Sequence, residues 1–410
     1  MHRIRVAVTA AFLGAAFILP HAEAHTLGYA LTHGTVDFSL RPRYESVVQP
    51  GKKVANAFTV RSLLGYETGA YAHVRAMLQL INVAGIVEDY NSIVNHNAAY
   101  AVIPDPEATN VNQAYLSYSG IAHTKIRAGR QIIVLNNGRF VGNVDFRQNM
   151  QTFDAVSVVN KGVPGLTLYG AYSWRLKDIL NQLVPVRVVL LNAGLVVAKK
   201  TLVSAYSYTY ENKAHTAIPG AALCGIAGGP EICNSETAGA RIAGQAPITS
   251  AARFLYVADW AHQWDVGGGS PLIDASYYHV GGGVGTGPTF ARLDYEVMGS
   301  NGSGTYGFQT PLATKHLFNG WAEIFLVTPQ TGLRSTYATV GTAIARAKIA
   351  ASYYRFRADH GSQRYGHEWD VSLIYPIRPG FVGGVQYADY HADTYAVNTK
   401  AAWVFVSYHY

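Results

Sequence analysis

Charged residues are scarce in this chain, and long hydrophobic runs are absent from most of it. Only 14% of the 410 residues are Asp, Glu, Lys or Arg, whereas soluble domains contain about a quarter. Mean hydropathy is nevertheless close to neutral, at +0.06. No run of about eighteen apolar residues follows residue 20, which argues against spanning helices there. Little charge without long apolar runs indicates a sheet with one apolar face and one polar face.

Cysteine is also nearly absent. Cys224 and Cys233 are the only two, and they lie nine positions apart in a stretch rich in Ala, Gly and Pro. In an exported chain, such a pair is expected to form a disulfide that closes one loop. A metal pair is the alternative, but no His or third Cys stands nearby to complete a site. We therefore predict a disulfide, no metal and no cofactor.

The first 24 residues have the pattern of an export signal. A short basic segment is followed by an apolar run from Val6 to Leu19, and Ala22-Glu23-Ala24 provides small residues for cleavage. The alternative is an N-terminal anchor helix, for which the apolar run is short. We predict that residues 1–24 are a signal peptide and that residues 25–410 form one domain.

Apolar and polar side chains alternate along the rest of the chain. In residues 36–45, Val36 and Phe38 share one face, whereas Asp37 and Arg41 share the other. This period of two is typical of a strand between two different environments. It predicts eighteen strands of about ten residues, the length that a tilted strand needs to cross a bilayer. They are 36–45, 56–67, 71–82, 111–120, 123–134, 151–161, 164–175, 187–195, 199–211, 235–245, 250–263, 273–284, 287–298, 333–344, 346–358, 366–376, 380–391 and 399–410.

The apolar faces are expected to meet lipid and the polar faces to meet water. In residues 71–82, Leu78 and Leu80 oppose Gln79. In residues 164–175, Ser173 and Arg175 fall on the polar face. In residues 199–211 the apolar face carries Leu202, Tyr206, Tyr208 and Tyr210.

Connections between the predicted strands alternate in length. Gly285-Thr286 and Pro376 to Pro379 are short turns, whereas 83–110, 135–150 and 299–332 are long. The sequence thus predicts an all-β transmembrane antiparallel β-barrel of about 18 strands, with short periplasmic turns and long extracellular loops. Lipid offers no hydrogen-bond partner to the backbone groups of a sheet edge, so the sheet must close. A barrel of this many strands encloses an aqueous lumen. A soluble β-sandwich or β-helix is the alternative, but the sequence has no short fixed repeat of the kind that a β-helix requires.

The carboxy-terminal segment alternates to its last residue. Val404, Val406, Tyr408 and Tyr410 share one face of residues 403–410. This resembles the terminal signal by which outer-membrane barrels are handed to the barrel assembly machinery. A final strand with interfacial tyrosines would carry the same pattern. We expect a location in the outer membrane of a Gram-negative cell, with outer-membrane lipid and this machinery as partners.

Three internal blocks resemble the alginate export family of outer-membrane porins. They read GRQ, NGRFVGNV, FRQN and QTFDA within 129–155, FNGWAE at 318–323, and YGHEWD at 365–370. The resemblance implies an eighteen-stranded barrel with an electropositive pore through which an acidic polysaccharide leaves the periplasm. The chain looks shorter than dedicated alginate exporters, so the fold carries over better than the substrate.

The polar positions that alternate along each predicted strand are expected to face the pore. Together with residues of the loop at 135–150, they give a set of candidate pore-lining and substrate-binding residues. Arginines keep their charge at any working pH and favour anions in a narrow throat. Acidic residues on the same wall would allow a carboxylated solute to bind loosely and leave, although any porin lumen needs charged residues for solvation. The set comprises Arg41, Arg43, Arg61, Arg75, Arg127, Arg139, Arg147, Arg175, Arg292, Arg355, Arg357, Asp145, Asp154, Glu368 and Asp370.

The favoured function is a passive channel for anionic solutes, with export of an acidic polysaccharide such as alginate as the narrower hypothesis. We expect no enzyme activity, because no nucleophile-elbow motif prepares one of the serines. An outer-membrane hydrolase is therefore the weaker alternative, and a surface receptor or adhesin that uses the long loops is another. The expected solutes are small anions or a uronate polymer; nucleic acid is not expected.

Overall fold

The computed structural model describes residues 26–214, 224–226 and 229–410. The predicted signal peptide, residues 1–24, lies outside the described residues. Helical structure in the described part is limited to α1 (Leu27–Thr32) and two 3-10 turns, η1 (Pro230–Cys233) and η2 (Lys315–Leu317). Within that part, no helix has the length and apolar character to cross a membrane.

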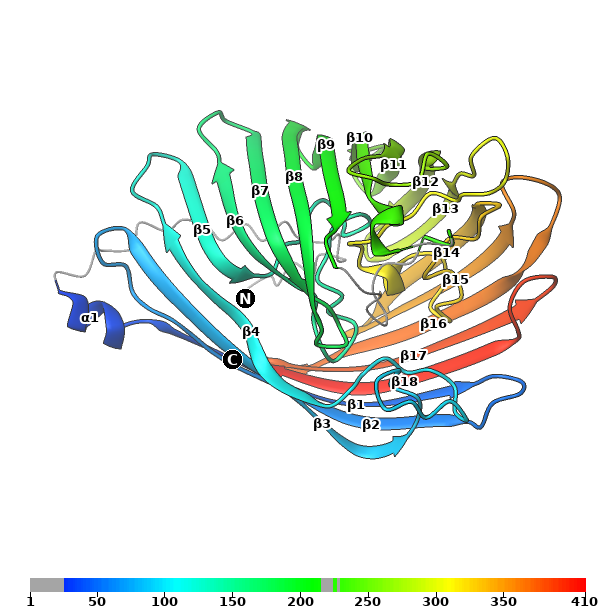
Figure 1. The fold of residues 1–410 in the computed structure, drawn as a ribbon, viewed down its shortest axis with the longest axis horizontal. Helices are drawn as coiled ribbons and strands as arrows, with labels where there is room; N and C mark the ends of the chain where they lie inside the picture. Colours follow the sequence, from blue (N-terminus) through cyan, green and yellow to red (C-terminus); the bar gives the residue numbers. More distant parts are fainter. Residues whose placement is uncertain (1–25, 215–223, 227–228) are drawn as a thin grey trace.

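Eighteen antiparallel strands make up a single sheet. Strand β1 pairs with both β2 and β18, and β9 pairs with β10, so the sheet closes on itself (Figure 1). The predicted barrel and its strand number are therefore confirmed. The strands are β1 (Thr35–Val48), β2 (Ala55–Glu67), β3 (Val74–Asp89), β4 (Ala108–Tyr118), β5 (Thr124–Gln131), β6 (Thr152–Asn160), β7 (Leu166–Lys177), β8 (Leu183–Ala198), β9 (Thr201–Asn212), β10 (Ser235–Pro247), β11 (Ala252–Asp265), β12 (Asp274–Thr286), β13 (Thr289–Met298), β14 (Leu333–Ile344), β15 (Ala347–Arg357), β16 (Arg364–Arg378), β17 (Phe381–Ala392) and β18 (Thr399–His409).

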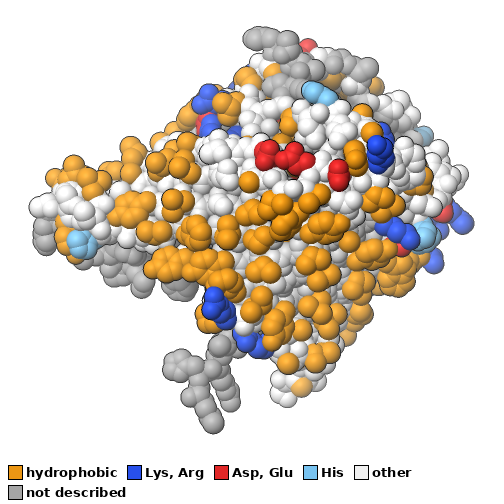
Figure 2. Space-filling model, turned by 90° about the horizontal axis from the view of Figure 1, so that it is seen from below, with side chains coloured by type: hydrophobic (Ala, Val, Ile, Leu, Met, Phe, Trp, Pro, Cys, Tyr) orange, Lys and Arg blue, Asp and Glu red, His pale blue; other side chains and the backbone are white. Residues whose placement is uncertain are grey.

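The alternation of the sequence becomes the two faces of the wall. Leu78 and Leu80 are 52% and 44% exposed, whereas Gln79 between them is 3% exposed because it points into the barrel. Outward-facing apolar side chains form a broad band across the face of the molecule in Figure 2. A closed barrel with such a band is the architecture of outer-membrane proteins, since only closure satisfies every strand edge in lipid.

Several predicted strand limits were wrong. Gly285 and Thr286 belong to β12, and the turn that follows is at 287–288. Pro376 lies within β16, beside a register shift at Arg378. Strand β5 ends at Gln131, because the chain then leaves the wall and enters the barrel.

The facing of β9 was also predicted wrongly. Tyr206, Tyr208 and Tyr210 point into the barrel and are at most 5% exposed. Tyr206 donates to Asp259 Oδ1 at 2.7 Å, and Asn192 Nδ2 donates to the Tyr208 hydroxyl at 2.8 Å. Tyrosine suits either environment, so alternation alone could not assign these rings to lipid or lumen.

Cys224 and Cys233 are joined in a disulfide, with Cα atoms 5.6 Å apart. The bond closes part of the connection between β9 and β10. Gln330 Nε2 donates to the Gly225 carbonyl at 2.5 Å, so the closed loop rests on the long segment that precedes β14.

Candidate functional site

Two long connections fold into the lumen and meet there. The loop at 132–151 follows β5 and the loop at 299–332 follows β13 (Figure 1). Val141 and Leu312 form a parallel bridge, and Gly142 N donates to the Leu312 carbonyl at 2.8 Å. Gln151 Nε2 donates to the carbonyls of Gly142 and Leu312, at 2.8 and 3.0 Å. Backbone groups of the two loops hydrogen-bond to each other. The loops therefore form one constriction rather than two separate flaps.

Arginines of the first two strands hold this constriction against the wall. Arg41 and Arg61 lie directly opposite each other in the β1–β2 register, and both point inward. Arg41 Nη1 donates to the Asp145 carbonyl at 2.8 Å, and Arg61 Nη1 pairs with Asp145 Oδ1 at 2.7 Å. Enclosure in the barrel opposes ionisation of Asp145, but the guanidinium groups of Arg61 and Arg41 outweigh it and lower the pKa of that carboxyl to about 2. The carboxylate thus separates two facing cations.

A second group of charges joins the loops to β1. Arg147 Nη1 lies 3.0 Å from Glu45 Oε1, and Arg43 Nη2 lies 3.0 Å from Glu45 Oε2. Asp105, from the connection before β4, pairs with Arg43, and Glu323 pairs with Arg147. Ion pairs enclosed in this way are costly to break, because each removed partner leaves a buried charge uncompensated.

His316 stands at the centre of the constriction. Its ring stacks on Phe146, with centroids 3.2 Å apart, and its Nδ1 lies 3.0 Å from Glu323 Oε1. Burial lowers the pKa of His316 to about 4. Burial opposes ionisation of Glu323, but Arg147 and His316 outweigh it and lower the pKa of Glu323 to about 2. At neutral pH the histidine is therefore uncharged and the glutamate is ionised.

Strands β13 and β16 carry inward acidic side chains. On β16, Glu368 and Asp370 point inward and are at most 1% exposed. Ala322 N donates to Glu368 Oε1 at 2.8 Å, and Trp321 N donates to Asp370 Oδ2 at 3.2 Å. On β13, Glu296 accepts from Arg139 Nε at 2.6 Å. This wall anchors the loops through their backbone N–H groups and one arginine.

Two inward arginines near the periplasmic turns have no carboxylate partner. Arg75 on β3 and Arg127 on β5 both face Ser117 of β4 in the strand register. Arg127 lies over the ring of Tyr115, 4.9 Å from its centroid. Neither arginine forms an ion pair within the described residues, and Arg127 Nε is buried without a hydrogen-bond partner. The two arginines therefore add positive charge to the lumen without a directly bonded carboxylate.

The structure divides the predicted site residues between lumen and outer surface. Strand residues that point inward, and loop residues that lie in the constriction, are Arg41, Arg43, Arg61, Arg75, Arg127, Arg139, Arg147, Arg292, Asp145, Glu368 and Asp370. Predictions for Arg175, Asp154, Arg355 and Arg357 were wrong, because these side chains point outward.

Two local features explain these errors, a bulge in β7 and the aromatic packing on β15. A bulge in β7 adds a residue between Ser173 and Arg175, so Arg175 turns outward and pairs with Asp154 at 2.6 Å. On β15 the inward positions are Tyr354 and Phe356; Phe356 packs against Phe325 of the inner loop, and Tyr354 stacks on Phe356 and Tyr337. The aromatic side chains of β15 therefore point into the barrel, and the arginines that alternate with them point outward.

Sequence reasoning missed several members of the constriction. Glu45 follows the inward parity of β1 and could have been selected by the same rule as Arg43. Asp105, His316 and Glu323 come from connections with no period, so nothing local indicated that they meet Arg43 and Arg147. No group of three or more His, Cys, Asp or Glu within the described ranges is placed to hold a metal ion.

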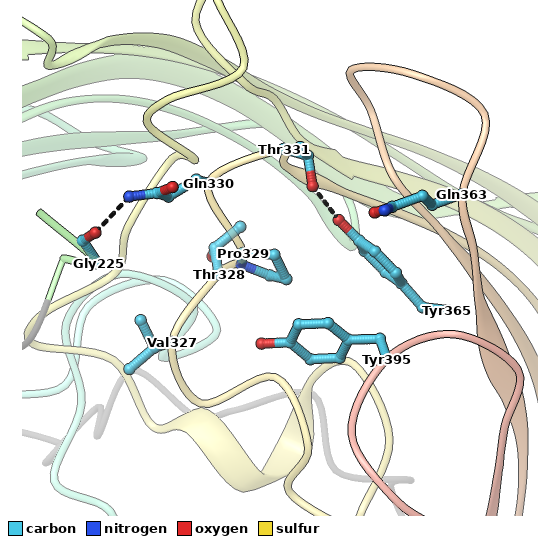
Figure 3. Close-up of a pocket in the computed structure, with 9 residues that line it drawn as sticks. All are labelled: Gly225, Val327, Thr328, Pro329, Gln330, Thr331, Gln363, Tyr365 and Tyr395. Carbon is cyan, nitrogen blue, oxygen red and sulfur yellow. Dashed lines mark hydrogen bonds between the residues drawn. The ribbon is translucent and has the colours of Figure 1, made fainter.

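A shallow cavity of about 360 Å³ lies at the extracellular side of the constriction. Tyr365 and Tyr395 line it together with Gln330, Thr331 and Gln363 (Figure 3). The Tyr365 hydroxyl shares a hydrogen bond of 2.5 Å with Thr331 Oγ1. Rings, amides and hydroxyls line this cavity, and none of its lining side chains carries a full charge.

No family model and no curated protein matches the chain, so the resemblance to the alginate export family gains no support from these comparisons. Solved structures do match. They include Pseudomonas aeruginosa OpdK with vanillate (TM-score 0.70, 13% identity, 93% of this chain and 99% of that one) and OccK9 (OpdG) of the same organism (0.69, 14%, 93% and 99%). Acinetobacter baumannii OccAB2 is similar (0.69, 14%, 93% and 100%). At these identities the likeness shows a shared fold, that of an eighteen-stranded outer-membrane porin barrel.

Proposed function

We propose that this protein is an outer-membrane channel for passive diffusion of small anionic solutes. The observation that carries the proposal is the pair Arg75 and Arg127, which lie inside the barrel without a carboxylate partner among the described residues. An anion that passes them gains charge-assisted hydrogen bonds without displacing an existing partner.

The distribution of charge across the lumen supports the same proposal. Strands β1 to β5 carry six inward cations together with the carboxylates Asp37, Glu45 and Glu67, whereas β11, β13 and β16 carry five inward carboxylates together with Arg292. An anion would follow the first wall and avoid the second. The six cations are Arg41, Arg43, Arg61, Arg75, Lys125 and Arg127, and the five carboxylates are Asp259, Asp294, Glu296, Glu368 and Asp370.

Export of an acidic polysaccharide such as alginate is a narrower hypothesis. The inner loops are bonded to each other at Val141 and Leu312 and to both walls. A constriction tied on all sides favours a small carboxylate over a polymer. Recognition of β18 by the barrel assembly machinery also remains a proposal, supported by its alternation up to Tyr408.

Planar-bilayer recording in a salt gradient tests the channel proposal. The wild type should show a stable current whose reversal potential indicates anion selectivity. In Arg75→Ser/Arg127→Ser, the potential should move toward zero, whereas the outward-facing variant Arg187→Ser should leave it unchanged.

Absence of any current would contradict the proposal and favour a receptor or adhesin. If current is present, adding uronate oligomers of increasing length separates the two substrate hypotheses. Block by short carboxylates but not by polymer is expected for small solutes.

A further inference from the structure

Arginines occupy adjacent outward positions on three neighbouring strands at the extracellular end. Arg334 of β14 lies directly opposite Arg357 of β15, which in turn lies opposite Arg364 of β16. All three side chains are exposed. Directly opposite residues have Cβ atoms about 5 Å apart, and like charges at that spacing destabilise a sheet. This row therefore calls for a compensating anion.

The next row toward the membrane continues the basic surface. Arg355 lies opposite His367, and His367 lies opposite His391. The two imidazole rings stack with centroids 5.1 Å apart. One row further, Tyr353 and Trp369 pack together with centroids 4.6 Å apart. Aromatic rings at this position mark the membrane interface, so the arginines lie at the level of the lipid headgroups.

Other outward arginines of the extracellular half have carboxylate partners. Arg130 and Arg175 both pair with Asp154, and Arg187 pairs with Glu211.

In the basic surface itself, Arg334 pairs with Asp359 at 2.7 Å, and Asp389 lies 3.3 Å from His391 and 3.8 Å from Lys400. Arg355, Arg357 and Arg364 form no ion pair within the described residues; Arg355 only lies 5.8 Å from the ring centroid of Tyr353. The uncompensated charge is thus confined to β15 and β16. Figure 2 shows Lys, Arg and His side chains gathered at the right-hand end of the apolar band, opposite the end that carries α1.

We infer that Arg355, Arg357 and Arg364 form a binding site for the phosphate groups of the phosphorylated glycolipid in the outer leaflet. Guanidinium groups bind phosphate through paired hydrogen bonds, and their position beside the aromatic residues places them where such a lipid presents its phosphates. The site lies on the outer wall, so the inference holds whichever solute the lumen passes.

Native mass spectrometry with diphosphorylated lipid A tests this site. Arg357→Gln/Arg364→Gln should bind the lipid about tenfold more weakly than the wild type, because two charge-assisted contacts are lost. Arg346→Gln/Arg378→Gln changes two arginines at the opposite, periplasmic ends of β15 and β16 and should bind like the wild type. Arg357→Lys/Arg364→Lys keeps the charge and should retain most of the binding.

Two further measurements identify the ligand and exclude a purely structural role. The wild type should bind dephosphorylated lipid A about as weakly as the Gln variant binds the intact lipid, and millimolar inorganic phosphate should not raise its melting temperature. Without lipid, the Gln variant should melt no lower than the wild type, because a like-charge contact is removed. Equal lipid binding by the Gln variant, equal binding of dephosphorylated lipid, stabilisation by inorganic phosphate alone or a lower melting temperature without lipid would each overturn the inference.

Discussion

At the scale of single residues, the constriction depends on charges that compensate one another out of bulk water. Arg147 contacts both Glu45 and Glu323, and therefore connects a wall strand to both inner loops. Removing one partner of such a group costs far more than removing an exposed ion pair, since the remaining charges stay enclosed.

Arg147→Gln is therefore expected to destabilise the barrel by about 3 kcal/mol or more. Urea unfolding in detergent micelles, followed by tryptophan fluorescence, measures the change. Arg187→Gln removes a half-exposed guanidinium group from Glu211, which keeps Lys213 as a second partner, and should cost about 1 kcal/mol or less. Equal costs for the two variants would show that the inner charges are solvated.

His316 makes the constriction sensitive to acid. Burial lowers its pKa from 6.5 to about 4, so the contribution of the neutral ring to loop docking is present above pH 6.5 and is lost as pH falls toward 4. Glu323, with a pKa lowered from 4.5 to about 2, loses its contribution only below pH 4.5.

Between pH 7 and pH 4.5, single-channel recordings should therefore show increasing open-state fluctuation that depends on His316. The variant His316→Gln should reduce this pH dependence while keeping a polar side chain near Glu323. An unchanged pH profile in that variant would assign the effect to other groups.

At the scale of elements, backbone conformation decides how the loop at 299–332 docks. Gly320 has φ +85°, and a Cβ built there would lie 2.4 Å from Glu368 Oε2. Only glycine adopts this conformation without strain while letting the neighbouring N–H groups reach the β16 carboxylates. The loop thus contacts the β16 carboxylates through its backbone, and a side chain at position 320 would block this contact.

Gly320→Ala should displace the loop from β16 and raise single-channel conductance. Gly302→Ala is the matched control, because it lies in the same loop and a Cβ there meets no atom within 4 Å. Its conductance should equal that of the wild type. Equal conductance in Gly320→Ala would show that the loop tolerates the added methyl group without opening.

At the scale of the whole molecule, closure places every second side chain in lipid. Val340 is 55% exposed on the outer face of β14, whereas its neighbour Thr339 points inward and bonds Ser352 at 2.9 Å. Adjacent positions of one strand therefore face two different solvents.

Val340→Lys is expected to destabilise the barrel by about 2–4 kcal/mol if that position lies near the bilayer midplane. Thr339→Lys should cost about 1 kcal/mol or less, because its ammonium group stays in the aqueous lumen. Unfolding in lipid vesicles compares the two, and similar costs would contradict the assigned faces.

Much of the architecture could be predicted from the sequence because alternate residues of a strand face lipid and water, and their polarity differs accordingly. The alternation around Leu78 and Gln79 correctly assigned both faces of β3, and the same rule placed Arg41, Arg43 and Arg61 inside. The rule failed at Arg175, where one bulged residue in β7 reversed the parity, and at Tyr206, whose ring suits either solvent.

The amino-acid sequence by itself determined the strand number, the closed sheet and the lipid-facing band, since period-two alternation and the need to satisfy strand edges act locally. Only the tertiary structure decided the constriction. Asp105 lies far along the chain from His316 and Glu323, and none of the three belongs to a repeating pattern. Asp105 meets Arg43, and Glu323 meets Arg147 and His316, because the closed wall brings three connections into one lumen. The basic row at Arg357 and Arg364 likewise depends on strand register, which alternation within a single strand cannot specify.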